Sequence, residues 1–247
     1  MKRQRIRKAL ILISFLLFPV TLNYFSPALI IEGAAKGIVV GSFIIFTALF
    51  FFALFLGRAF CGWLCPGAGL QEACFVVQDK TVKGGKRNWI KYFIWVPWIT
   101  TIAFFAIRAG GLHSIKPFYQ MESGISVTDP FNYVIFYIVI LLIAVPAFVT
   151  GRRAFCHRFC WMAPFMVIGD EIGRLLKLPG LRLTSDRNKC VSCRTCTKKC
   201  PMSLDVNQMV QRGSMTNSEC ILCGTCVDGC SKGAIAYSFS AGKQIAR

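Results

Sequence analysis

Four stretches of this chain are apolar enough and long enough to cross a lipid bilayer. They run from about Ala9 to Phe25, from Gly37 to Leu56, from Trp89 to just before Arg108, and from Phe131 to Val149. A helix of about 20 apolar residues spans the ~30 Å hydrocarbon core of a membrane. Lys91, near the start of the third stretch, is expected to extend its ammonium group to the interface. The pattern predicts an integral membrane α-helical protein with four transmembrane helices.

The basic residues are distributed unevenly around these stretches. Of 29 Lys and Arg residues, 26 lie in the N-terminal segment, in the loop between the second and third stretches, or after the fourth; the others are Lys36, Arg108 and Lys116. Because cytoplasmic loops carry an excess of Lys and Arg, we predict a multi-pass protein of the cytoplasmic (inner) membrane with both termini in the cytoplasm. The net charge of +18 is then a topology signal beside membrane lipid, and no nucleic-acid partner is expected.

The first stretch follows a basic N-terminus, as a secretory signal peptide would. No small-residue cleavage site comes after it, and the segment from Asn23 to Pro27 has the composition of a helix exit. We therefore expect a retained transmembrane helix.

The composition changes near Arg182, where apolar runs stop and Cys, Lys, Ser and Gly become frequent. The chain is accordingly divided into a membrane domain, 1–181, and a small cytoplasmic α+β ferredoxin-like domain, 182–247. The second part holds two copies of a C-x2-C-x2-C-x3-C motif, formed by Cys190, Cys193, Cys196 and Cys200, and by Cys220, Cys223, Cys226 and Cys230. In this spacing three thiolates bind one [4Fe–4S] cluster and the fourth binds the other.

The ligand sets predicted from this rule exchange the last cysteine of each motif. Cluster 1 takes Cys190, Cys193, Cys196 and Cys230, and cluster 2 takes Cys220, Cys223, Cys226 and Cys200. Zinc and disulfides are the alternatives. Zinc sites usually pair two C-x2-C units across a longer gap, and disulfides are disfavoured in a reducing cytoplasm.

The membrane domain contains an internal repeat. The segment Arg58-Ala-Phe-Cys61-x3-Cys65 recurs 95 residues later as Arg153-Ala-Phe-Cys156-x3-Cys160, each time directly after an even-numbered stretch. A proline follows each motif, immediately at Pro66 and four positions on at Pro164, and predicts a short amphipathic interfacial helix with Pro near its start. Such helix N-termini favour an anionic thiolate group. Four thiolates from two repeats could complete one further iron–sulfur cluster.

Two other interpretations of these four cysteines remain open at this stage. Each repeat could hold its own cluster, finished by ligands other than Cys. Alternatively, the cysteines could be buried small hydrophobic residues, since free Cys is among the most buried residue types. Their recurrence in one repeated frame favours cofactor binding.

A few ionisable or thiol side chains near the repeats are weaker candidates. Glu72, Asp170 and Glu171 could handle protons at a quinol site, because ionisable groups at membrane depth tend to be functional, or could be solvated at the interface. His157, inside the second motif, could be a ligand, a proton carrier near a quinone, or an interfacial residue. Cys74 has no counterpart in the second repeat and is expected to be structural.

The order of these parts resembles a known family, the membrane polyferredoxins of the NapH quinol dehydrogenase type. The segment from Cys61 through Cys65, Pro66 and Gln71 to Glu72 is similar to the family signature, whereas Cys160 lacks the directly following proline. The resemblance implies an electron-transfer subunit of an oxidoreductase in anaerobic respiration. It would link menaquinol, through clusters, to other redox subunits. Relatives serve nitrous oxide, methylamine and cytochrome oxidase assembly systems.

Two further functions remain compatible with the residues. One is a quinone-independent electron-relay adaptor that docks a partner within a larger membrane complex. The other is an assembly or regulatory factor that reduces a metal or senses redox state. Cluster reduction by quinol would favour the quinone-linked subunit over the adaptor, and steady electron turnover would separate both from an assembly factor.

Overall fold

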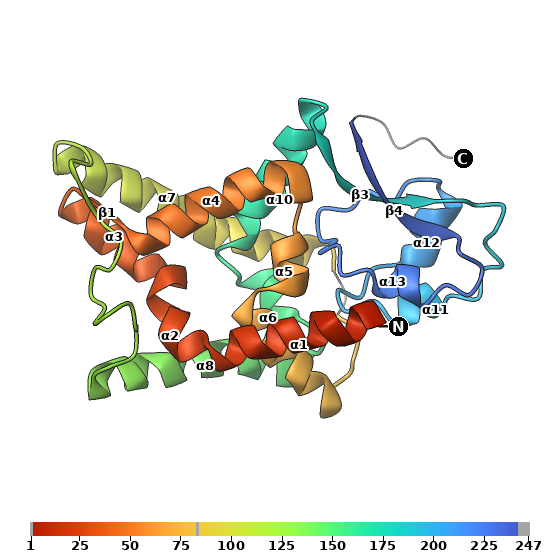
Figure 1. Cartoon of the computed structure of the whole chain (residues 1–247), viewed down its shortest axis with the longest axis horizontal. Helices are drawn as coiled ribbons and strands as arrows, with labels where there is room; N and C mark the ends of the chain where they lie inside the picture. Colours follow the sequence, from red (N-terminus) through yellow and green to blue (C-terminus); the bar gives the residue numbers. More distant parts are fainter. Residues whose placement is uncertain (1, 83, 242–247) are drawn as a thin grey trace.

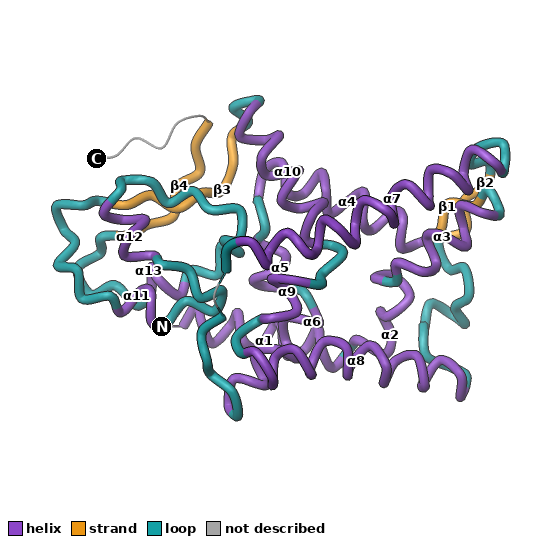
Figure 2. Tube along the Cα trace, turned by 180° about the vertical axis from the view of Figure 1, so that it is seen from behind, coloured by secondary structure: helices purple, strands orange, loops and turns teal. Residues whose placement is uncertain are grey.

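The computed structural model describes residues 2–82 and 84–241. A long helical region joins a smaller region of two strands and short helices at one end (Figure 1). The N-terminus lies beside this smaller region, as both views show (Figures 1 and 2). Arg3 pairs there with Asp228 at 2.5 Å, and the Gln4 amide donates to the carbonyl of Cys223 at 2.9 Å.

Two helical segments are long and apolar enough to cross a membrane. They are Lys86–Arg108, formed by the 3-10 helix η3 (Lys86–Trp89) and α7 (Ile90–Arg108), and α8 (Pro130–Thr150). A third span is possible if α1 (Lys2–Leu16) counts together with α2 (Phe18–Thr21) and η1 (Leu22–Phe25), which are bent by 61° from it. The membrane association predicted from the sequence therefore rests on two or three helices among the described residues.

The four-span prediction is only partly reproduced, for local reasons. Pro19 lies in the first turn of α2, where a helix tolerates proline but the preceding helix cannot continue through it. In the second stretch, Ile38–Val40 forms strand β1, which leaves only 16 residues for α4 (Gly41–Leu56). At 1.5 Å per residue, α4 is about 24 Å long, shorter than the hydrocarbon core.

The end of the helical region remote from the small sheet contains its own short pairing. Helix α3 (Pro27–Ala35) begins at the Ser26 cap and leads to β1, which pairs in parallel with β2 (Ser114–Lys116). Figure 1 shows α3 and β1 at this far end, beside the tip of α7. The two loops that join the long helices are thus fixed to each other.

The first cysteine of each C-x3-C motif lies in a short helix, and the second cysteine lies between that helix and the next one. In the first repeat these are α5 (Ala59–Trp63) and α6 (Pro66–Ala73), with η2 (Cys74–Val76) after them. In the second repeat they are α9 (Ala154–Arg158) and α10 (Ala163–Leu175). Helix α6 packs against α8 of the other repeat, and α10 packs against α4. The repeats are therefore interlocked, and proline lies in the first turn of α6 and α10 as predicted.

The C-terminal region is α+β, as expected. Strand β3 (Pro179–Ser185) pairs antiparallel with β4 (Ile235–Ala241), from Pro179 opposite Ala241 to Ser185 opposite Ile235. Three short helices complete it: α11 (Thr195–Lys198), α12 (Val206–Gln211) and α13 (Thr225–Asp228). The sheet begins slightly before Arg182. Residues 242–247 of the expected domain lie outside the described residues.

Candidate cluster-binding site and cavity

The interlocked repeats bring Cys61, Cys65, Cys156 and Cys160 into one buried core. Each of the four is 5–6% exposed. Cys65 caps the N-terminus of α6, and Cys160 lies just before α10. Electrostatic interaction links Cys65 to the other three thiols, so the four groups are mutual neighbours.

The surroundings of these thiols follow an approximate two-fold symmetry. The thiol of Cys61 lies 3.5 Å from the sulfur of Met166, and the Gln71 amide donates to Cys156 Sγ at 3.1 Å. Met166 is the residue 95 positions after Gln71, the same interval that separates the two cysteines. The residues before and after each motif are therefore arranged around a common centre.

Backbone donors at the two helix N-termini obey the same symmetry. The N–H of Ala68 acts on Cys65, and the N–H of Ala163 acts on Cys160. Burial nevertheless raises the pKa of Cys160 to about 12, and it also raises the pKa of Cys65 and of Cys156. As free groups these would be neutral thiols at pH 7. A bound metal group would hold them as thiolates.

Buried ion pairs around the centre form two groups that the sequence did not predict. Glu72 receives hydrogen bonds from Arg7, at 2.8 Å, and from Arg153. Glu219 receives them from Arg58, at 2.9 Å, and from Lys91. Each group contains two cations and one carboxylate, so each carries a net charge of +1. The signal available in the sequence was the arginine repeated three residues before each first cysteine.

Two sequence expectations change at these ion pairs. Lys91 does not reach the interface: it is fully buried and bonded to Glu219, because the C-terminal region covers the start of α7. Burial alone would raise the pKa of Glu72, but the charges of Arg153 and Arg7 lower it to about 2. Glu72 is thus an ionised structural carboxylate, with no free proton to donate near neutral pH.

The ferredoxin-like region contains two small cavities, each lined by one of the predicted ligand sets. Cys190, Cys193, Cys196 and Cys230 line the first, and Cys200, Cys220, Cys223 and Cys226 line the second. In the part of the chain that the structure describes, no three His, Cys, Asp or Glu side chains converge on one metal ion. The cysteines surround cavities instead, which suits a polynuclear group better than a single zinc ion.

Backbone conformation explains why each motif can fold around a cavity. Ser192 and Arg194 have positive φ in the first motif, as do Leu222 and Gly224 in the second. A side chain at Gly224 would also meet the Tyr237 hydroxyl, 2.5 Å from the Cβ position. These left-handed residues turn the backbone around the sulfur atoms, and glycine is needed where β4 approaches.

One of the two ferredoxin cavities lies directly against the repeats. Trp63 donates its indole N–H to the carbonyl of Leu222 at 3.1 Å, and Arg58 donates to the carbonyl of Ser218 at 2.9 Å. A Cβ at Gly62 would be 2.3 Å from the carbonyl oxygen of Ile221. The first C-x3-C motif therefore touches the loop that carries Cys220 and Cys223.

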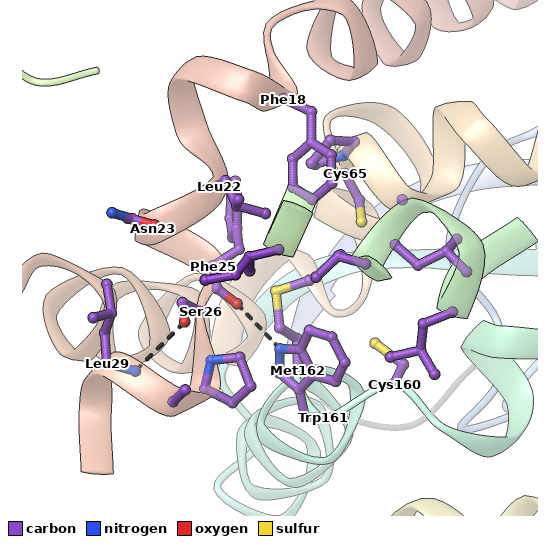
Figure 3. Close-up of a pocket in the computed structure, with 18 of the residues that line it drawn as sticks. Phe18, Leu22, Asn23, Phe25, Ser26, Leu29, Cys65, Cys160, Trp161 and Met162 are labelled. Carbon is purple, nitrogen blue, oxygen red and sulfur yellow. Dashed lines mark hydrogen bonds between the residues drawn. The ribbon is translucent and has the colours of Figure 1, made fainter. Parts of the chain in front are cut away.

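A cavity of about 520 Å³ opens beside the four-cysteine centre, in the helical region. Figure 3 shows Cys65, Cys160 and Met162 at this cavity, together with Phe18, Leu22 and Phe25 from the N-terminal segment. Most of its lining is apolar. The polar side chains of its lining include Asn23, Ser26, Glu32, Gln71, Gln120 and Asn132.

The candidate proton groups predicted from the sequence do not line this cavity. Glu72 is held by two arginines, and Asp170 pairs with Arg174 and with Arg182 at 3.8 Å. His157 is buried beside a separate polar cavity that Glu219 also lines, and burial lowers its pKa to about 4. Glu171 is exposed on α10. Cys74 is buried outside the four-cysteine centre, as expected for a structural thiol.

Comparison with protein families identifies iron–sulfur binding in both parts of the chain. Residues 189–235 match a model described as a 4Fe-4S dicluster domain. A second model, described as a 4Fe-4S binding domain, matches twice, at residues 38–83 and 131–179. The double match coincides with the two C-x3-C repeats.

Related proteins extend over most of the chain. An uncharacterized protein of Methanocaldococcus jannaschii is 26% identical, with 84% of this chain and 77% of that protein covered. YccM of Escherichia coli, named for electron transport, is 24% identical over 81% of this chain and 56% of its own length. The methylamine utilization ferredoxin-type protein MauN of Methylobacillus flagellatus is 25% identical, over 85% of this chain and 71% of its own length. No solved structure matches.

Proposed function

Because this chain belongs to the NapH-type membrane polyferredoxins, an iron–sulfur electron-transfer family, we propose that it links the quinone pool to redox partner proteins. In this role it is an electron-transfer subunit anchored in the membrane. The observation that carries the proposal is the large apolar cavity lined by three of the four cysteines shared between the repeats.

We assign the cysteines of the C-terminal region to two [4Fe–4S] clusters. Cys190, Cys193, Cys196 and Cys230 would hold one, and Cys200, Cys220, Cys223 and Cys226 the other; the two cavities with these linings support the assignment. Such clusters supply one-electron redox chemistry when bound. The positive-φ residues of each motif hold the thiols at the rim of their cavity.

A third iron–sulfur cluster is assigned to Cys61, Cys65, Cys156 and Cys160 together. The pairing of Cys61 with Met166, and of Cys156 with Gln71, crosses between the repeats and supports one shared centre over two separate ones. The two buried ion-pair groups supply a net charge of +2 around it. A [4Fe–4S] group with four thiolates carries about two negative charges, so the surroundings fit its charge.

The three ligand sets form a sequence from the membrane outwards. The repeat cysteines contact the Cys220 loop through Gly62 and Trp63, and the Cys190 set lies beyond it. Cys193 is exposed at the outer end. Lys189, Arg194 and Lys232 line the adjoining cavity, so this surface suits an acidic redox partner. We place this end, and both termini, in the cytoplasm.

The cavity beside the repeat cysteines is the proposed quinone site. Its volume of about 520 Å³ is in the range of small-molecule pockets, and its apolar lining suits an isoprenoid quinone. Along α8 the lining extends from Phe131 to Ile143, about 18 Å of helix. Gln71, whose carboxamide already bonds Cys156, Gly67 and Phe155, lines the cavity near the thiols.

The proposal is tested by anaerobic mixing of the purified protein with a menaquinol analogue. We expect reduction of the repeat-centred EPR signal, and expect Val139→Phe, which narrows the cavity, to slow that reduction at least tenfold. Val145→Phe places the same side chain on an exposed face of α8 and serves as the matched control. Equal rates for both variants, or no reduction by quinol, would contradict the quinone link and favour a quinone-independent adaptor.

A further inference from the structure

Two arginines at equivalent positions of the repeats are buried next to the four-cysteine centre. Arg58 and Arg153 each precede the first cysteine of a motif by three residues, and their side chains are only 1% and 0% exposed. Arg153 also donates to the carbonyl of Cys61 at 2.7 Å, which ties the second repeat to the first motif. Burial of two guanidinium groups in equivalent places indicates a shared task.

Neither arginine uses all of its hydrogen-bond donors. The Nε and Nη2 atoms of Arg58 and the Nε atom of Arg153 are buried without a partner. A buried donor left unpaired is destabilising, and native proteins rarely contain one. These N–H groups therefore point to an acceptor that the protein chain itself does not supply.

The neighbouring groups identify the chemistry of that acceptor. Arg58 acts electrostatically on Cys61 and Cys156, and Arg153 acts on Cys156 and Cys223. Glu72 and Glu219 neutralise only part of the positive charge, because each is shared with a second cation. An anionic group with sulfur acceptors, bound between the two repeats, would satisfy both the free donors and the remaining charge.

We propose that Arg58 and Arg153 are a symmetric pair of positioning residues that donate to sulfur atoms of the group bound by the repeat cysteines and stabilise its reduced form. This inference rests on the proposed third cluster. Reduction adds one negative charge to the group, so two fixed neighbouring cations favour the reduced state. Glu72 and Glu219 hold the guanidinium groups in place.

The test is an EPR-monitored redox titration of the full-length protein in detergent, with iron analysis of each sample. We expect Arg58→Gln and Arg153→Gln each to lower the reduction equilibrium constant of the repeat-centred signal about tenfold, or about 59 mV for a one-electron couple. The double variant should show a shift close to the sum of the two single-variant shifts. The potential of the signal from the cluster at Cys190, Cys193, Cys196 and Cys230 should not change.

Three further variants separate this role from a merely structural one. Arg58→Lys and Arg153→Lys keep the charge but lose the planar fork, so their shifts should be smaller than those of the Gln variants. Arg174→Gln breaks a partly buried ion pair with Asp170, in a cavity lined by Cys220 and by none of the four repeat cysteines, and should cause a clearly smaller shift. Loss of only the repeat-centred iron in a Gln variant also supports the inference.

The inference is overturned if both Gln variants keep their iron and the potential of the repeat-centred signal does not change. An equal shift with Arg174→Gln would overturn it as well. If the Gln variants fail to fold, the Lys variants decide: a potential shift larger than that of Arg174→Gln supports the role, and none contradicts it. A native protein with only two clusters would instead refute the third centre of the proposed function.

Discussion

Arg58 and Arg153 occupy equivalent positions in the two repeats, yet they meet carboxylates from different parts of the molecule. Arg153 of the second repeat pairs with Glu72, which lies in α6 of the first repeat. The position equivalent to Glu72 in the second repeat is Val167, which has no charge to offer. Arg58 pairs instead with Glu219 of the C-terminal region. The missing carboxylate of one repeat is thus replaced by the docked ferredoxin-like region.

The two repeats also differ in how they contact the C-terminal region. The cysteines and their Met166 and Gln71 neighbours are arranged symmetrically, but the first motif contacts the Cys220 loop through Gly62 and Trp63, whereas the second repeat donates from Arg152 to the carbonyl of Cys200. His157, the counterpart of Gly62, lies beside another cavity. The cysteines and their neighbours are thus nearly symmetric, whereas the two repeats contact the C-terminal region through different residues.

The largest expected effect on stability comes from removing the carboxylate of Glu72, which pairs with Arg7 and Arg153. Glu72→Gln leaves Arg7 and Arg153 buried without a counter-charge, so we expect a loss of about 3–5 kcal/mol of stability at pH 7. Thermal unfolding in detergent would measure it. The matched control, Glu171→Gln on the exposed face of α10, should change stability by less than about 0.5 kcal/mol. Equal losses would contradict the structural role of the ion pair.

The same carboxylate predicts a pH dependence. The pKa of Glu72 is lowered to about 2 from 4.5, so its contribution is complete above pH 4.5 and is lost as the pH falls from 4.5 towards 2. The native protein should lose stability across that window more steeply than Glu72→Gln does. Parallel acid-unfolding curves for the two proteins would show that Glu72 contributes nothing there.

The carboxylate of Glu219 is expected to control the docking of the C-terminal region on the helical region more than global stability. Glu219→Gln removes the partner of Arg58 and Lys91, so residues 182–241 should exchange amide hydrogens faster while the α4 and α10 core stays protected. Asp186→Asn, which breaks an ion pair with exposed Lys189, is the control. Unchanged exchange in Glu219→Gln would contradict the docking role.

The close contact at Gly62 gives a smaller, steric effect. Gly62→Ala would place Cβ 2.3 Å from the Ile221 carbonyl oxygen and force the two regions apart, at a cost of about 1–3 kcal/mol. Gly67→Ala, whose Cβ would lie 3.5 Å from Ile143, meets only ordinary contact and should be tolerated. Unfolding midpoints and the magnetic coupling between EPR signals would report both effects. Similar behaviour of the two variants would argue against tight docking.

The smallest expected effect concerns Gln71 and Met166, the equivalent residues of the two repeats that contact the thiols of Cys156 and Cys61. Gln71→Met removes the N–H donor at Cys156, so the potential of the repeat-centred signal should fall by a few tens of mV, less than about 59 mV. Met166→Gln supplies a donor at Cys61 and should raise it by a similar amount. Shifts of the same sign would break the proposed equivalence of the two repeats.

Patterns of residue type and spacing were sufficient to predict the α+β C-terminal region, the repeat, and short helices with proline in the first turn. They did not predict where the spans break: the bend arises locally at Pro19, and the pairing of Ile38–Val40 with β2 depends on a distant loop. From the sequence, Arg7 is only one of the basic residues of the N-terminal segment, and Lys91 is expected at the interface. Their burial depends on carboxylates 65 and 128 positions away, which no local pattern reveals.

The central claim is that the two repeats share one cluster, and single-cysteine variants test it most directly. We would compare Cys61→Ser and Cys156→Ser by iron analysis and EPR. Sharing predicts that the native protein holds about 12 iron atoms, that each variant retains about 8, and that both lose the same signal while the two ferredoxin signals persist. Loss of a different signal in each variant, or native iron content in either, would contradict the account.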